Sequence, residues 1–229
     1  MRLDRFLQLN TEYGRQSIRT LLATGEVEVD GVVVSEPRHT VSRFSDIRLQ
    51  QLQLQSAQAK YFMLHKPAGV VSATEHNEHP TVLDLLDNED REGLHLAGRL
   101  DLKTTGLVLL TNDGGWSRRV TQPEKKVAKV YRVETQDPIA AETEKVFSEG
   151  IYFRYENITT RPAQLQRLGA RRSRLTLYEG RYHQVKRMFG YFDNEVIALH
   201  RESIGDIVLD AKLKPGEYRA LSSAEIALF

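Results

Sequence analysis

Apolar residues near the N-terminus recur at helical spacing. The stretches 3–7 and 18–22 each carry large apolar side chains at positions i, i+3 and i+4. This spacing places those side chains on one face of a helix. The pattern therefore predicts two short amphipathic helices, and Gly25 follows the second as a C′ glycine that ends it.

Beyond Gly25 the chain changes to the alternation that is typical of strands. Val27-Glu28-Val29 alternates with a period of two, and Asp30-Gly31 separates it from the valines at 32–34. An Asp-Gly pair between two such runs is a strong signal of a tight hairpin turn. We therefore expect two helices and then a β-hairpin within the first 35 residues.

Strand patterns dominate the remainder of the chain. The segment 60–66 ends in a Pro-x-Gly turn, 107–110 is a continuous apolar run after a break at Gly106, and 129–133 alternates. Further strands are expected at 175–179, 196–199 and 207–209. From position 184 onward, the apolar residues Val185, Met188, Phe189 and Phe192 form a helical stripe. Ser222-x-x-Glu225 is typical of a capping box at a final short helix.

The stretch 50–59 is rich in glutamine, uncharged and without a coherent apolar face. It is typical of a strand end that runs into a linker. We therefore expect a small α/β domain at 1–55, a linker at 56–60 and an α+β domain at 61–229, which is long enough for a sizeable core.

Composition narrows the class of protein. The 229 residues include no cysteine, which excludes disulfide scaffolds and thiolate metal sites and fits a reducing compartment. The N-terminus lacks the apolar core of a signal peptide, and no apolar run approaches the roughly 18 residues that span a membrane. We expect a cytoplasmic protein with no membrane partner.

The net charge of +1 hides an uneven distribution of charge. The segment 161–187 carries eight Lys or Arg against one acid, and 114–132 carries six against one. One such cluster is more often a solvated face. Two clusters that flank the same candidate acid favour a polyanionic partner such as nucleic acid.

That candidate acid is Asp101. It lies between the lead-in Gly98-Arg99-Leu100 and the turn Thr104-Thr105-Gly106, immediately before the buried strand 107–110. A carboxylate at the end of a buried strand, two residues from an arginine, is not typical of a solvent-exposed residue without a function. This contiguous run resembles the signature motif of the pseudouridine synthases, in their RsuA/RluB/RluE/RluF branch, and the resemblance implies that Asp101 is the essential catalytic residue.

Three further segments resemble motifs of the same family. Lys66-Pro67-x-Gly69 resembles its first motif, although His65 stands where asparagine is usual. The strand 129–133 is similar to the motif that supplies the active-site tyrosine, here Tyr131. The segment 180–188 resembles Gly-Arg-x-His-Gln-Val-Lys/Arg-Arg-Met, which implies that Lys186 pairs with the catalytic aspartate and favours its ionised form.

The resemblance also implies how RNA is held. The two N-terminal helices followed by Gly-x-Val-x-Val-Asp-Gly resemble an S4 RNA-binding module, although a small α/β packing module is the alternative. Basic side chains are the candidate phosphate contacts. The candidates for RNA binding are Arg2, Arg5, Arg15, Arg19, Lys66, Arg99, Arg181, His183 and Arg187. Base flipping is expected, with Arg99 filling the space that the target base leaves.

The function implied is isomerisation of one uridine to pseudouridine in 16S ribosomal RNA, at a position-516-type site. Isomerisation requires no cofactor, no metal site is expected, and the protein is expected to act as a monomer on ribosomal RNA, as free RNA or as an assembly intermediate with ribosomal proteins. Asp101 could add to C6 of the ring, attack C1′ or remove the C2′ proton, and Tyr131 could remove the C5 proton.

Three alternatives remain at this stage. A synthase of the same branch could act on 23S ribosomal RNA. A non-catalytic S4-type ribosome-assembly factor would bind RNA without chemistry. A two-carboxylate glycosidase also breaks a glycosidic bond, but no second acid lies in a comparable motif.

Overall fold

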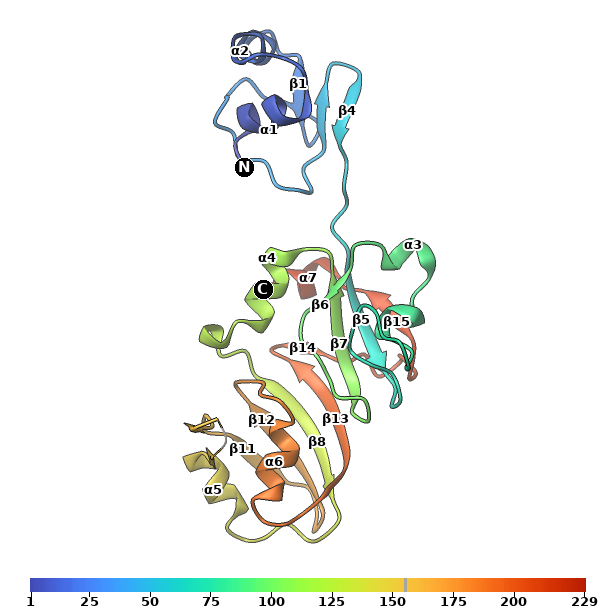
Figure 1. Cartoon of the computed structure of the whole chain (residues 1–229), viewed down its shortest axis with the longest axis vertical. Helices are drawn as coiled ribbons and strands as arrows, with labels where there is room; N and C mark the ends of the chain where they lie inside the picture. Colours follow the sequence, from blue (N-terminus) through green and yellow to red (C-terminus); the bar gives the residue numbers. More distant parts are fainter. Residues whose placement is uncertain (155) are drawn as a thin grey trace. The chain divides into compact units, whose positions relative to one another are not determined.

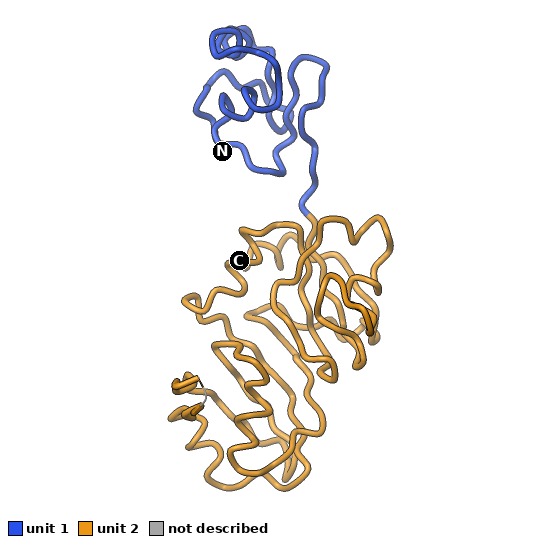
Figure 2. Tube along the Cα trace, in the orientation of Figure 1, with its two compact units in different colours: residues 1–59 blue, residues 60–229 orange. Residues whose placement is uncertain are grey.

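The computed structural model describes residues 1–154 and 156–229. The chain forms two compact units, unit 1 at 1–59 and unit 2 at 60–229, so that the division falls inside the stretch that the sequence suggests as a linker (Figure 2). Each unit has its own hydrophobic core. No helix among the described residues is both long and apolar enough to cross a membrane.

Unit 1 contains two helices and a small antiparallel sheet (Figure 1). Its elements are α1 (Leu3–Asn10), α2 (Arg15–Ala23), β1 (Val27–Val29), β2 (Val32–Val33), β3 (Ile47–Leu49) and β4 (Leu52–Gln55), with the strands in the order β2-β1-β3-β4. Both predicted helices and the hairpin are confirmed. Asp30 and Gly31 have φ angles of 53° and 78°, the left-handed conformation that a type I′ turn requires at both central positions.

The predicted apolar stripes form the core of unit 1. Leu3 and Leu22 are fully buried, and they pack with Val27 and Ile47 from the sheet. The glutamine-rich stretch differs from the prediction, since it contains the complete strand β4. Gln50 turns the chain at a φ of 56°, and Leu49 pairs with Leu52 across the hairpin. Backbone pairing explains this strand, because β4 is half exposed and needs no continuous apolar face.

Unit 2 is built on one large sheet with helices on its surfaces (Figure 1). Its strands are β5 (Tyr61–Lys66), β6 (His95–Leu96), β7 (Thr105–Thr111), β8 (Lys129–Thr135), β9 (Tyr152–Phe153), β10 (Ile158–Thr159), β11 (Gln164–Arg167), β12 (Arg172–Leu177), β13 (Val196–Ile204), β14 (Ile207–Val208) and β15 (Tyr218–Ala220). Its helices are η1 (Val82–Leu85), α3 (Asn88–Arg91), α4 (Gly114–Thr121), η2 (Pro123–Lys125), α5 (Thr143–Glu149), α6 (Gln184–Gly190) and α7 (Ser223–Ile226).

The main sheet runs in the order β11-β12-β8-β13-β7-β5-β15, with β14 paired to β13 and β6 to β7. Among the described strands, β13 and β7 form the single parallel pair, so the sheet is mixed and mostly antiparallel as expected. The parallel pair is close-packed: Gly106 has a φ of 107°, and a Cβ there would collide with the backbone of Arg201. The break predicted before the strand is wrong, because Gly106 lies inside β7 and permits this approach.

Side chains alternate across the sheet and form two cores. On β7, Val108 and Leu110 join the core that includes Phe147 and Met188 of α5 and α6. Leu107 and Leu109 join the opposite core, with Trp116 of α4. A strand buried on both faces reads as a continuous apolar run, which is why 107–110 shows no alternation in the sequence.

Candidate active site

The backbone of the loop before β7 is held by a buried lysine. Lys66, the last residue of β5, is fully buried, and its Nζ donates to the carbonyl oxygens of Asp101 at 3.1 Å and Thr104 at 2.8 Å. It also reaches the carbonyls of Pro67 and Leu102 at 3.0 and 3.2 Å. Burial lowers the pKa of the Lys66 amine to about 8, against the opposing effect of the Asp101 charge. This ammonium fixes the turn that carries Asp101.

A second buried cation holds the two ends of the same loop. Arg201 of β13 is 1% exposed, and its Nε donates to the carbonyl of Leu107 at 2.8 Å while Nη1 donates to that of Arg99 at 3.3 Å. Leu100 N donates to the hydroxyl of buried Ser72 at 3.0 Å. Strands on both sides therefore hold the loop in one conformation, and Asp101 projects from a rigid support.

The turn before α6 brings two further side chains to Asp101. Gln184 is buried, accepts a hydrogen bond from the Arg181 backbone at 3.0 Å and donates to the buried carboxylate of Glu179 at 2.7 Å. This network closes the turn 179–184. His183 is left with a φ of 49°, an uncommon conformation for a residue other than glycine, and such conformations cluster at functional sites.

Asp101 lies between two basic side chains. Its Oδ2 is 3.6 Å from Nζ of Lys186, and its Oδ1 is 3.6 Å from Nε2 of His183. All three side chains are about one-third exposed, at 30%, 34% and 38% for Asp101, Lys186 and His183. The carboxylate is thus accessible to a substrate and close to the side-chain nitrogen of Lys186.

Tyr131 of β8 lies in the wall of the same cavity. It is 7% exposed, and it lines a cavity of about 630 Å³ together with Asp101, Lys186 and His183. This volume is within the range of about 300–1,000 Å³ that is usual for small-molecule sites, and so is large enough for one nucleotide base and its sugar. The structure therefore brings the three predicted catalytic residues to one cavity.

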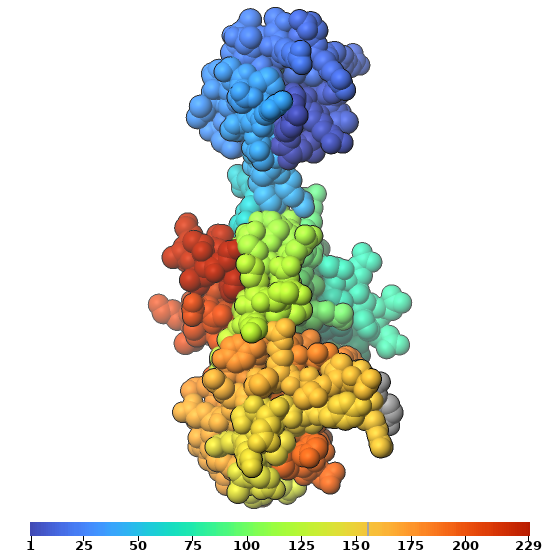
Figure 3. Space-filling model, turned by 90° about the vertical axis from the view of Figure 1, so that its left-hand side faces the viewer, coloured from blue at the N-terminus to red at the C-terminus, as the bar shows by residue number. Residues whose placement is uncertain are grey.

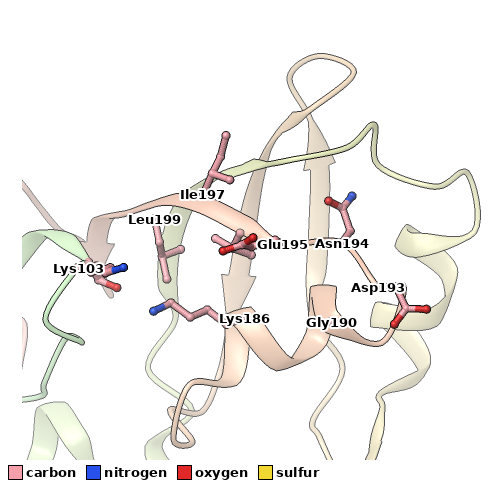
Figure 4. A pocket seen from close by; sticks show the side chains of 10 residues that line it. Lys103, Lys186, Gly190, Asp193, Asn194, Glu195, Ile197 and Leu199 are labelled. Atoms are coloured by element: carbon pink, nitrogen blue, oxygen red, sulfur yellow. The ribbon is translucent and has the colours of Figure 1, made fainter.

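A smaller hollow of about 410 Å³ shares Thr104, Lys186 and Leu199 with this cavity (Figure 4). Figure 4 shows Lys186 extending from α6 towards Lys103, with Asp193 and Glu195 further along the wall. Acids and bases line this hollow together. It therefore lacks the single sign of charge that would mark a phosphate site.

The prediction that Lys66 binds RNA is wrong. Its ammonium is buried and directed at four backbone carbonyls, so no donor is left for a phosphate. The sequence could not separate a lysine that holds a loop from one that faces solvent. Arg99, by contrast, is exposed and lines the cavity, so it stays a candidate.

Several other candidate arginines are already engaged in ion pairs. Arg181 Nε lies 3.0 Å from Glu179, and Arg187 forms a bidentate pair with Glu156 at 2.7 Å while its guanidinium stacks 3.7 Å from the Phe153 ring. Within the same basic stretches, Arg132 and Arg174 share Glu202, and Arg167 pairs with Glu144. The number of basic residues in these stretches of the sequence is therefore larger than the number of positive charges that have no acidic partner.

The exposed segment of unit 2 around α4 carries further basic side chains, of which Arg119 donates to the backbone carbonyl of Phe229. Arg118, Arg119, Lys125 and Lys126 are all exposed. Figure 3 shows the segment at the surface of unit 2, in yellow-green. In unit 1, Arg5, Arg15 and Arg19 are exposed on or beside the two helices, while Arg2 pairs with Asp4. Contact of these side chains with RNA stays a prediction.

Three residues of the site were not predicted from the sequence. These are Lys129, Arg201 and Tyr182, which all line the cavity. Tyr182 is 76% exposed, and its ring stacks on that of His183 at a distance of 3.9 Å. Because side chains alternate along a strand, Lys129 lies on the same face of β8 as Tyr131, and this pattern could have predicted Lys129 as a residue of the site. No sequence pattern indicated Arg201, because strand alternation alone cannot show which buried position lies under a loop. No group of three His, Asp or Glu suited to a metal occurs in the described part of the chain.

Comparisons with known proteins identify the family. Residues 60–191 match the model of the RNA pseudouridylate synthase family. The chain is 54% identical over 227 residues to a protein of Pseudomonas aeruginosa named ribosomal small subunit pseudouridine synthase A, covering 99% of both. It is 44% identical over 233 residues to the Escherichia coli K12 protein of that name, with 99% of both covered.

A solved structure shows the same fold. The crystal structure of a pseudouridylate synthase superposes with a TM-score of 0.72 at 40% identity, covering 99% of this chain and 98% of the other. The match spans the mixed sheet and its helices as well as the segments that carry Asp101, Tyr131 and Lys186. The chain belongs to the RNA pseudouridine synthase family and is an enzyme that isomerises uridine in RNA.

Proposed function

We propose that this enzyme converts one uridine of small-subunit (16S) ribosomal RNA to pseudouridine, at the position-516-type site, as a member of the RsuA-like branch. The observation that carries the proposal is the accessible carboxylate of Asp101, 3.6 Å from both Lys186 and His183 at the cavity that Tyr131 lines. The relatives at 54% and 44% identity, named for the ribosomal small subunit, support the choice of RNA.

The chemistry suits this arrangement. The reaction breaks the N1–C1′ bond, turns the uracil and joins C5 to C1′; C5 loses a proton and N1 gains one, so no cofactor is consumed. Asp101 acts on the ring at C6, on C1′ or on the C2′ proton, with the Lys186 ammonium 3.6 Å from its carboxylate. In this proposal the phenol of Tyr131, which lines the cavity, stacks on the uracil and takes the C5 proton.

Unit 1 is proposed as the docking module. Its two helices carry Arg5, Arg15 and Arg19 at exposed positions and are followed by the hairpin of β1 and β2, an arrangement that supports an S4-like RNA-binding role. The same proposal has the enzyme act in the cytoplasm as a monomer, on ribosomal RNA free or in an assembling particle.

Mapping of pseudouridine tests the proposal directly. Purified protein is incubated with unmodified 16S and 23S ribosomal RNA, and carbodiimide-stop primer extension is run on both. One new stop in 16S RNA that is absent with Asp101→Asn supports the proposal. A stop confined to 23S RNA would transfer the enzyme to the large subunit and refute the substrate.

Absence of a stop in either RNA, with tight binding to both, would favour the assembly-factor alternative for this substrate. Repeating the incubation with reconstituted small-subunit particles distinguishes this outcome from a requirement for ribosomal proteins. A stop that appears only with particles would keep the 16S target and identify the particle as the substrate.

A further inference from the structure

Two cations in the wall of the cavity have no role in the chemistry assigned so far. Lys129 of β8 and Arg201 of β13 both line it, on adjacent strands where Arg201 pairs with Tyr131 and Ile204 with Lys129. Because side chains alternate along a strand, Lys129 projects on the same face of β8 as Tyr131, two residues away. Lys129 is therefore next to the position proposed for the uracil ring.

Neither cation has a carboxylate partner in the described part of the chain. The Lys129 ammonium donates to the Val127 carbonyl at 3.1 Å, and Arg201 reaches only backbone carbonyls. Nη2 of Arg201 is buried and has no hydrogen-bond partner among the described residues. The acids that line the cavity are engaged elsewhere, since Asp101 faces Lys186 and His183, and Glu179 binds Arg181 and Gln184.

Uncompensated buried charge is costly, so native proteins normally pair it. Burial, and after it the positive charge of Arg201, lowers the pKa of Lys129 to about 8. The amine is therefore still mainly protonated at pH 7. An electron-rich oxygen supplied by the substrate would complete the hydrogen bonding of the ammonium and offset the charge of both side chains.

We propose that Lys129 is a catalytic residue that donates a hydrogen bond to a carbonyl oxygen of the target uracil, with Arg201 behind it as a positioning residue that adds positive potential. When the N1–C1′ bond breaks, its electron pair stays on the uracil, and the negative charge spreads onto the carbonyl oxygens. The new C5–C1′ bond consumes this charge, and Lys129 keeps its proton throughout.

A phosphate oxygen of the substrate offers similar chemistry. The position of Lys129 beside Tyr131 favours the base, because the exposed Arg99 is better placed for phosphates. The inference rests on the family's reaction, and it holds for a uridine in 16S or 23S RNA alike. A failed 16S assignment would therefore leave it testable on whichever uridine is mapped.

The first test measures binding to the base itself. Full-length Asp101→Asn, which cannot convert the RNA, is titrated with an RNA fragment that carries the mapped target uridine and with the same fragment bearing an abasic ribose there. Lys129→Met is added to this background. We expect the preference for the uridine-containing RNA to fall roughly tenfold or more, as for loss of a hydrogen bond to a charged group.

The double comparison separates the base from other contacts. Equal loss of affinity for both RNAs would place Lys129 at a phosphate, and an unchanged preference would make it a structural residue; either result overturns the proposal. Lys145→Met, on the exposed surface of α5, is the matched control and should change neither affinity.

The second test measures the chemical step. In single-turnover assays at saturating protein, Lys129→Met should react about 100-fold more slowly or worse, as when an oxyanion donor is removed, whereas Lys129→Arg should recover most of the rate. Equal rates for the Met and Arg variants would show that the charge is not used. Unfolding curves verify the fold of each variant, and Lys129→Gln replaces Lys129→Met if the latter does not fold.

Discussion

The ammonium of Lys186 lies 3.6 Å from one carboxylate oxygen of Asp101, although one belongs to α6 and the other to the loop before β7. Two separate devices produce this pair. Buried Lys66 fixes the loop by its carbonyls, and the Glu179–Gln184 hydrogen bond fixes the turn before the helix. Preorganisation of this kind keeps the charged groups in position before the substrate enters.

Asp101→Asn tests the central residue. The amide cannot act as nucleophile or base, so turnover should fall by several orders of magnitude. The loop is held through backbone atoms, so the variant should keep its fold and its affinity for RNA. Pseudouridine formation at saturating enzyme, with RNA binding measured in parallel, checks both statements. Turnover close to that of the wild type would refute the assignment.

Lys186 can be tested by comparing two substitutions. Lys186→Arg preserves a cation beside Asp101, and we expect a reduction in rate of less than about tenfold. Lys186→Met removes the positive charge 3.6 Å from the Asp101 carboxylate, so the rate should fall about 100-fold or more. His183, 3.6 Å from the other oxygen, is unchanged in both variants and serves as a common background. Indistinguishable rates would mean that the ion pair is not used in the reaction.

Tyr131→Phe separates stacking from proton transfer. The ring and its packing in the cavity wall remain, so RNA affinity should change by less than about threefold, while loss of a general base should slow the reaction about 100-fold or more. Single-turnover rates and equilibrium titrations on the same RNA provide the comparison. A loss confined to affinity would make Tyr131 a stacking surface alone.

Lys66→Met tests whether Lys66 holds the loop before β7 rather than binding RNA. The substitution leaves four carbonyl oxygens, that of Thr104 buried and the others part-buried, without their shared donor, so the free energy of unfolding should fall by about 3 kcal/mol. Activity should fall with it, because the loop holding Asp101 loosens, whereas the salt dependence of RNA binding should not change. Urea unfolding and RNA titrations at several salt concentrations measure the two effects. A shallower salt dependence with unchanged stability would restore Lys66 as a phosphate contact.

Local patterns predicted part of the fold. The stripes of α1 and α2, the Asp30-Gly31 turn and the Ser222–Glu225 capping box are all found in the structure, because each depends on residues close in sequence. Strand β4 was missed, since its existence depends on pairing with β3 rather than on an apolar face.

The residues of the site that lie in recognisable sequence motifs could be predicted, and the others could not. The sequence indicated Asp101 and Lys186, and the structure places them together. Lys66 and Arg201 depend on long-range geometry: each is a cation buried under one loop, where backbone carbonyls replace the water it would otherwise bind. Residue type alone does not distinguish such a position from a surface contact.

The last prediction concerns the arginines of unit 1. Arg5, Arg15 and Arg19 are exposed on or beside α1 and α2, where they are free to reach a polyanion. If they bind phosphates, replacing all three by glutamine in the full-length chain should weaken RNA binding. Each lost contact should reduce the slope of log affinity against log salt by about 0.9 on duplex-like RNA, by analogy with B-DNA.

The chemical step should be unaffected at saturating RNA, because Asp101 and its partners belong to unit 2. Arg48→Gln is the matched control, since Arg48 is an exposed arginine of unit 1 on β3, beside Asp46. A salt slope as shallow in this control as in the triple variant would reflect the net charge of unit 1 rather than particular contacts. An unchanged slope and affinity in the triple variant would mean that these helices do not bind the RNA, and the docking role would pass to the exposed basic segment around α4.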